Sequence, residues 1–101
     1  MEDIEATELE YWASLGLLKE VTAALAANPD ANVRGVNCST AMHAAATNGH
    51  LNVIRFLAAH GANLDAVLDS GETPLMLAKL AKEHEAVALL ESLGARECPT
   101  S

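Results

Sequence analysis

The feature that most constrains this sequence is a repeat with a spacing of 33 residues. Identical residues recur at this spacing in five places: Thr40 and Thr73, Ala45 and Ala78, Leu57 and Leu90, Gly61 and Gly94, and Ala62 and Ala95. Apolar character is kept where identity is lost, as at Ile54 and Val87. A fixed period of this length is typical of stacked supersecondary units that pack on their neighbours. The sequence therefore predicts an elongated stack of about three units.

The composition favours helices over strands. Apolar residues make up 50% of the chain, which has only one Trp, one Tyr and one Phe. The apolar content is therefore mainly Ala, Leu and Val, which suits closely packed helices better than a sandwich of aromatic-rich strands. We expect an all-α chain that forms a single domain over residues 1–101.

The middle unit has the clearest helix signals. The hydroxyl of Thr40 can cap a short, Ala-rich helix over residues 41–47, and Gly49 can end it in the left-handed conformation. A second helix is expected at about residues 50–60, with Gly61 at its end. After that glycine, the chain is expected to run on as an extended segment through residues 62–66.

The third unit repeats this plan with one change. Thr73 is expected to cap a helix that has Pro74 at its first position, where the missing N–H costs nothing. A second helix follows through Leu90 and ends at Gly94. Lys82-Glu83 stands where the middle unit has Gly-His, so we expect the turn between these two helices to be distorted or partly helical.

The first unit keeps the register but is degenerate. Its matches to the middle unit at the same spacing are Thr7, Ala13, Gly16, Leu18 and Ala26. Asn28-Pro29-Asp30 replaces the closing Gly-Ala and is expected to end the second helix, because proline cannot continue it. The units are expected at about residues 7–35, 36–68 and 69–98, with frayed ends at 1–5 and 97–101. Two modified ends favour a short stack that is complete in itself.

The charge narrows the class of partner. Fourteen acidic and six basic residues give a net charge of −8, which argues against nucleic acid and against an anionic membrane surface. It permits a protein partner with a basic surface, although a role in solubility alone would also explain this net charge. The N-terminal sequence lacks the basic region of a secretory signal, and no apolar run is long enough to span a membrane. Cys38 and Cys98 are expected to be free thiols in a reducing, cytoplasmic setting.

Two six-residue segments carry a resemblance to a known family. Thr40-Ala41-Met42-His43-Ala44-Ala45 and Thr73-Pro74-Leu75-Met76-Leu77-Ala78 both resemble the T-P-L-H-x-A signature of ankyrin repeats, and the match extends through Gly49-His50 and Gly61-Ala62-Asn63. The resemblance covers about residues 7–96. It implies an all-α solenoid of three helix-turn-helix units with short β-hairpin connections and an L-shaped cross-section. Met76 departs from the signature, so only the middle unit has the Thr-His pairing.

The resemblance implies protein binding through the hairpin tips and the concave face of the inner helices, without enzymatic activity. No catalytic residue, cofactor or metal site is expected. His43, His50 and His60 would be scattered by the repeat, and His43 is expected to satisfy backbone groups. Cys38 lies near a helix start, which can lower the pKa of a thiol, but a small residue tolerated in a turn explains it more simply.

Trp12 stands where the later units have Ala45 and Ala78. The first unit has no preceding neighbour in this sequence, so a large side chain there can cap the end of the stack. The alternative is that Trp12 and Tyr11 anchor a partner, as aromatic residues often do. The sequence leaves both interpretations open.

A partner-binding surface follows from position in the repeat. Hairpin tips are expected at Val36, Asn37, Ser39, Asp69, Ser70 and Glu72, and the ends of the inner helices add Ser14, Thr47, Asn48 and Leu80. Val36 and Leu80, flanked by Asp69 and Glu72, would form a mixed apolar and acidic patch. A neutral, solvated edge is the alternative, because isolated exposed apolar residues are common.

These expectations favour a non-enzymatic protein-binding module, monomeric on its own, with no nucleic acid, membrane or cofactor. Its small size and acidity are compatible with an inhibitor, or with an immunity or antitoxin protein that masks a basic effector. The alternative is a structural subunit that stacks into a homo-oligomer or a larger assembly.

Overall fold

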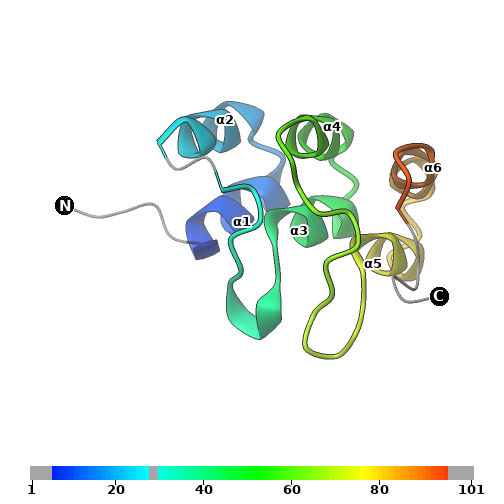
Figure 1. The fold of residues 1–101 in the computed structure, drawn as a ribbon. Helices are drawn as coiled ribbons and strands as arrows, with labels where there is room; N and C mark the ends of the chain where they lie inside the picture. Colours follow the sequence, from blue (N-terminus) through cyan, green and yellow to red (C-terminus); the bar gives the residue numbers. More distant parts are fainter. Residues whose placement is uncertain (1–5, 28–29, 96–101) are drawn as a thin grey trace.

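The computed structural model describes residues 6–27 and 30–95, which form three pairs of helices (Figure 1). The helices are α1 Ala6–Leu15, α2 Leu18–Ala27, α3 Ala41–Thr47, α4 Leu51–Ala59, α5 Pro74–Leu80 and α6 His84–Ser92, with one 3-10 turn, η1, at Val36–Cys38. The first helices of the pairs form an inner row and the second helices an outer row (Figure 1). The described part of the chain contains no strand, so the predicted all-α fold is confirmed. Its extents of 41, 25 and 20 Å make it elongated, as the repeat predicts.

The predicted caps of α3 and α5 are confirmed. Thr40 Oγ1 accepts the His43 N–H at 3.4 Å, and His43 Nδ1 accepts the Thr40 N–H at 3.2 Å. Thr73 Oγ1 accepts the Met76 N–H at 3.2 Å, and Pro74 is the first residue of α5. Each threonine therefore satisfies a donor that the first turn of its helix leaves unpaired.

The turn inside each helix pair is closed by the same backbone hydrogen bond. In the middle pair, Gly49 has φ +71°, and the next residue, His50, donates its N–H to Ala45 O at 3.0 Å. The other pairs repeat this bond, from Leu17 to Trp12 at 3.0 Å and from Glu83 to Ala78 at 2.9 Å. These bonds place Trp12, Ala45 and Ala78 at one structural position, as the 33-residue register predicts.

The expectation that the turn at Lys82-Glu83 is distorted or partly helical is wrong. Lys82 adopts φ +63°, so a lysine takes the left-handed conformation that Gly49 has in the middle pair. Its N–H bonds to Lys79 O at 3.1 Å, and the bond from Glu83 to Ala78 O is kept. Hydrogen bonding and packing of the two helices therefore override the local preference of lysine, which is strained by about 1–2 kcal/mol in this conformation.

The segment after α4 also differs from expectation. Residues 62–66 do not run out as one extended stretch, because Ala66 donates its N–H to Asn63 O at 3.4 Å. The Asn63 side chain accepts the Asp65 N–H at 3.0 Å, a local bond that favours a turn. The Asn63 N–H in turn bonds to Asn32 Oδ1 at 2.6 Å, which ties the loop to the equivalent loop of the first pair.

The core runs along the whole stack between the two rows. Fully buried alanines let the inner helices approach closely, whereas larger side chains fill the space toward the outer row. The alanines are Ala13, Ala45, Ala46 and Ala78, and the larger residues are Met42, Val53, Ile54, Leu57 and Leu90. The inner helices consequently pack on one another more extensively than the outer helices do.

Two histidines of the middle pair reach the neighbouring pairs. His50 Nε2 bonds to Ser14 O at 2.9 Å, and its ring lies against Gly16, where an added Cβ would come within 2.6 Å of Nδ1. This close approach requires a glycine at that turn. His43 contacts the third unit, as described below.

Some sequence expectations lie outside the described residues. Helix α2 ends at Ala27, and Asn28 and Pro29, which were expected to end it, are not described. The same holds for Cys98 and for the termini expected to fray.

Candidate functional site

Two loops project from the inner row, one before α3 and one before α5 (Figure 1). In the first loop, the Gly35 N–H bonds to Ser39 O at 2.7 Å and the Cys38 N–H bonds to Gly35 O at 3.1 Å. Asn37 and Cys38 have φ values of +60° and +64°. We call residues 35–39 the first hairpin tip.

The second loop closes in a similar way. The Leu68 N–H bonds to Glu72 O at 2.9 Å, and the Gly71 N–H bonds to Leu68 O at 2.8 Å. We call residues 68–72 the second hairpin tip. The inner surface, as used below, consists of the two hairpin tips, the exposed and partly buried residues of α1, α3 and α5, and Asn48 directly after α3.

The two hairpin tips are held side by side. The Asp69 N–H bonds to Asn37 O at 2.9 Å. Arg34 Nη1 bonds to Cys38 O and to Val67 O, each at 3.0 Å, so one guanidinium joins the two loops. These bonds form within the free chain, so a partner would meet tips that are already ordered. Preorganisation of this kind lowers the entropic cost of binding.

His43 fixes the second hairpin tip to α3. Its side chain is 1% exposed, and its Nδ1 accepts the Thr40 N–H, so the proton lies on Nε2 and is donated to Glu72 O at 3.1 Å. Burial lowers the pKa of His43, although the carbonyls of Glu72 and Ala66 favour the charged ring. The predicted role of His43 in satisfying backbone groups is confirmed.

Acidic side chains line this region. The Ser39 hydroxyl donates to the Glu10 carboxylate, and the Ser70 hydroxyl donates to the Glu72 carboxylate. Asp69 is exposed at the second tip. Arg34 contacts both tips, and its bonds go to backbone carbonyls.

Cys38 has no features of an activated nucleophile. Its pKa is raised, first by the hydrogen bond to the Asp69 carboxylate, then by desolvation and by the charge of Asp69, and Arg34 offsets this only in part. The idea that a nearby helix start lowers this pKa is wrong, because the carboxylate interaction dominates. The simpler interpretation, a small residue in a turn, agrees with the structure.

Three polar residues expected at the ends of the inner helices already bond to their own helices. The Ser14 hydroxyl donates to Tyr11 O at 2.7 Å, the Thr47 hydroxyl donates to His43 O at 2.8 Å, and Asn48 Nδ2 donates to Ala44 O at 3.1 Å. Their remaining capacity is mainly as acceptors.

Leu80 is the most exposed large apolar side chain of the described residues, at 71%. It borders a shallow hollow of about 290 Å³, lined also by Glu72, Met76 and Lys79. Of the predicted mixed patch, the structure brings Leu80 and Glu72 to one hollow, whereas Asp69 does not line it. The Val36 side chain lies outside the described residues.

The sequence reasoning missed Met76 and Lys79 as part of this surface. In the sequence, Met76 stands out only as a departure from the repeat signature. The signal was available, because residues four apart on a helix share a face, and Met76 precedes Leu80 by four.

Trp12 and Tyr11 have different surroundings. Trp12 is half-buried and packs against the core, whereas Tyr11 is 60% exposed. The equivalents of Trp12, Ala45 and Ala78, are fully buried. The larger side chain therefore occupies the open end of the first pair.

Within the described ranges, no three His, Cys, Asp or Glu residues are grouped so that they could hold a metal ion. None of the described helices has the length and apolar character needed to cross a membrane.

Comparison with known proteins identifies the repeat. The family described as Ankyrin repeats (3 copies) matches residues 9–99. The chain is 34% identical over 95 residues to a probable E3 ubiquitin-protein ligase, XBOS31, of Oryza sativa subsp. japonica, which covers 92% of this chain and 21% of that protein. It is 37% identical over 67 residues to alpha-latrocrustotoxin-Lt1a of Latrodectus tredecimguttatus, which covers 66% of this chain and 4% of the toxin. The chain thus spans about a fifth or less of the length of these curated relatives.

Proposed function

Because this chain belongs to the ankyrin-repeat family, we propose that it is a non-enzymatic module that binds one partner protein through its inner surface. The observation that carries the proposal is the pair of ordered hairpin tips, joined by the Asp69–Asn37 bond and by Arg34. The residues proposed to contact the partner are Val36, Asn37, Ser39, Thr47, Asn48, Asp69, Ser70, Glu72, Leu80, Ser14 and Trp12. Ankyrin repeats are protein-protein interaction modules in general. The proposal adds which residues of this chain contact the partner.

The partner would present a basic surface with an apolar side chain. The carboxylates of Glu10, Asp69 and Glu72 supply the acidic part of the inner surface, and Leu80 with its hollow supplies the apolar part. Charge of this kind mainly sets the association rate and the orientation of the partner. Apolar anchors in pockets supply much of the binding energy.

Within this class, the proposed role is inhibition by masking, as an immunity or antitoxin protein does for a basic effector, in the cytoplasm. The motivation is the net charge of −8 together with Asp69 and Glu72 in the second hairpin tip.

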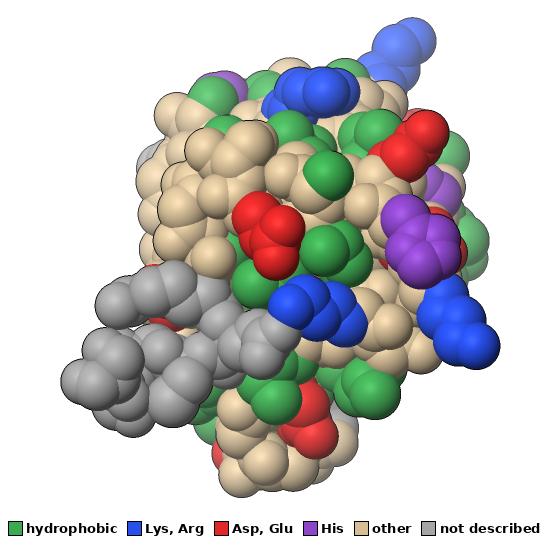
Figure 2. Space-filling view, turned by 90° about the vertical axis from the view of Figure 1, so that its right-hand side faces the viewer, with side chains coloured by type: hydrophobic (Ala, Val, Ile, Leu, Met, Phe, Trp, Pro, Cys, Tyr) green, Lys and Arg blue, Asp and Glu red, His purple; other side chains and the backbone are tan. Residues whose placement is uncertain are grey.

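A second candidate is a subunit that stacks on another copy. Figure 2 shows hydrophobic side chains among isolated charged groups on the end of the stack formed by α5 and α6. Val87 of α6 is only partly buried, whereas Ile54, its equivalent in the middle pair, is fully buried. Leu93, directly after α6, is 40% exposed. Light scattering across a dilution series separates the candidates, because a binding module stays monomeric and a stacking subunit remains oligomeric.

The decisive experiment is purification of the natural partner with the tagged chain, followed by cross-linking and mass spectrometry. Cross-links are expected at the hairpin tips, and added salt is expected to weaken capture. Cross-links confined to the outer helices, together with capture that does not depend on salt, would contradict the proposed inner surface.

A further inference from the structure

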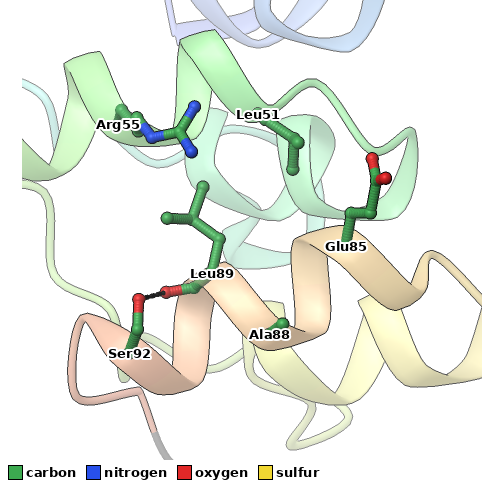
Figure 3. Close-up of a pocket in the computed structure, with 6 residues that line it drawn as sticks. All are labelled: Leu51, Arg55, Glu85, Ala88, Leu89 and Ser92. Atoms are coloured by element: carbon green, nitrogen blue, oxygen red, sulfur yellow. Dashed lines mark hydrogen bonds between the residues drawn. The ribbon is translucent and has the colours of Figure 1, made fainter.

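The outer row contains a groove that the proposed function does not use. It lies between α4 and α6, has a volume of about 430 Å³, and is lined by Leu51, Arg55, Glu85, Ala88, Leu89 and Ser92 (Figure 3). None of these residues belongs to the inner surface defined above. Leu51 and Leu89 pack against the core, so the floor of the groove is held in place by the fold.

This groove is larger than the hollow at the other junction of the outer row. At the junction of α2 and α4, the hollow is about 180 Å³, and Phe56 lines it. The Phe56 ring also packs on the His60 ring, with centroids 4.1 Å apart. Leu89 takes the place of Phe56 in the next unit, and a leucine side chain fills less of the space between the two outer helices.

The two ends of the groove carry opposite charges. Figure 3 shows the Arg55 guanidinium over Leu89 at the end near Ser92, and the Glu85 carboxylate near Leu51 at the other end. No hydrogen bond or ion pair within the described chain engages the Arg55 guanidinium or the Glu85 carboxylate. The Ser92 hydroxyl donates to Leu89 O at 2.7 Å and so serves its own helix. The groove therefore offers one free cation and one free anion on either side of an apolar floor, counting the described residues alone.

The geometry points to a helix as the occupant. Glu85, Ala88, Leu89 and Ser92 lie on one side of α6, so the groove spans two helical turns, or about 10 Å at 1.5 Å per residue. A channel between two neighbouring helices accepts the side-chain ridge of a third helix. We propose that this groove binds an amphipathic helix of a partner protein, with a basic side chain on Glu85, apolar side chains on the floor, and an acidic side chain on Arg55.

The open shape of the groove argues against a small-molecule ligand, because such ligands are usually buried over most of their surface. The groove also needs a partner of mixed charge, whereas the inner surface needs a basic one. This chain therefore has two distinct binding faces, one on each row, and can hold two proteins at once.

The test uses two synthetic peptides, each held helical by a side-chain lactam bridge. The first has Lys, Leu, Leu and Glu at positions i, i+3, i+4 and i+7, and the second has Gln in place of both Lys and Glu. Titration of the isotope-labelled chain is followed by NMR. The first peptide is expected to shift amides of α4 and α6 and to bind at least about tenfold more tightly than the second. Absence of saturable binding by either peptide up to about 1 mM, equal affinities, or shifts centred on the hairpin tips would overturn the proposal.

Four variants sharpen this test. Leu89→Phe fills the groove as Phe56 does in the preceding junction and should abolish binding of the first peptide. Leu93→Phe, at the residue that directly follows α6 and lies outside the groove, should leave binding unchanged. Removal of the charges, Arg55→Gln with Glu85→Gln, should abolish the preference between the peptides, and it remains informative if Leu89→Phe fails to fold. Asp69→Lys with Glu72→Lys should not affect the peptides, which separates this groove from the inner surface. Peptide affinities unchanged by both Leu89→Phe and the removal of the two charges would refute the assignment.

Discussion

The turn at Lys82 allows a direct test of the balance between local strain and the hydrogen bonding of the stack. Lys82→Gly removes a side chain from a residue at φ +63°. The left-handed conformation costs an L-residue about 1–2 kcal/mol, and glycine loses about 0.5–1 kcal/mol more chain entropy on folding than other residues. The difference predicts that Lys82→Gly raises the free energy of unfolding by about 0.5–1 kcal/mol. For a chain of this length, the melting temperature should rise by about 2–6 °C.

Gly49→Ala is the matched variant at the equivalent turn and should have the opposite effect. A Cβ at Gly49 would lie 2.3 Å from Glu83 Oε1, in addition to the strain of φ +71°. We expect a loss of more than about 1 kcal/mol, even if the Glu83 side chain moves aside.

Urea unfolding followed by far-UV circular dichroism measures both variants on the same chain. Equal m values would show that each variant changes stability rather than the compactness of either state. If Lys82→Gly lowers the midpoint or leaves it unchanged while Gly49→Ala lowers it, the assignment of strain to Lys82 is refuted.

Three further predictions concern the remaining features. Burial lowers the pKa of His43 below its ordinary 6.5, so between the folded and unfolded pKa values the unfolded chain binds more protons than the folded chain. The contribution of His43 to the free energy of unfolding is therefore greatest above pH 6.5 and decreases as the pH falls below it. An NMR titration of the ring with a midpoint at or above 6.5 would contradict this. Trp12→Ala should lower the free energy of unfolding by about 1–3 kcal/mol, because the half-buried ring packs on the core, whereas Tyr11→Ala should change it by less than about 0.5 kcal/mol; thermal melts of the two variants distinguish an end cap from an exposed anchor. Asp69→Lys with Glu72→Lys should weaken binding of a basic partner by about tenfold or more with little change in the melting temperature, and an unchanged affinity by calorimetry would move the interface away from the second hairpin tip.

Much of the fold was predictable because the same helix-start and helix-end residues occur in two of the three units. Thr40 and Thr73 mark helix starts through side-chain chemistry that acts within three residues, so the sequence alone locates α3 and α5. The helix expected at about residues 50–60 is α4, at Leu51–Ala59. Short-range rules of this kind depend little on the rest of the fold.

The errors arose where tertiary contacts override local preference. The turn at Lys82 keeps its geometry because Glu83 bonds to Ala78 and the two helices pack on each other, which no propensity of lysine predicts. Asn63 redirects its loop through its own side chain and through Asn32, a residue of the preceding unit.

The candidate site was less accessible than the fold. Position in the repeat predicted that the hairpin tips project, but not that Arg34 joins them, because this depends on a guanidinium reaching two carbonyls in different loops. The hollow beside Leu80 likewise depends on a loop residue, Glu72, meeting a helix residue, Met76. The depth of such a hollow depends on how the side chains pack, which cannot be predicted from the sequence alone.

The two histidine bonds of the middle helix pair bear on how the chain folds. His50 reaches back to Ser14 O and His43 reaches forward to Glu72 O, so both interfaces of the stack depend on one pair of helices. In a repeat protein, stability is approximately the sum of what each unit contributes alone and what each interface adds. The middle helix pair takes part in both interfaces, whereas the first and third pairs each take part in one. Opening therefore begins at the two ends, and the amides of α3 and α4 exchange with solvent last.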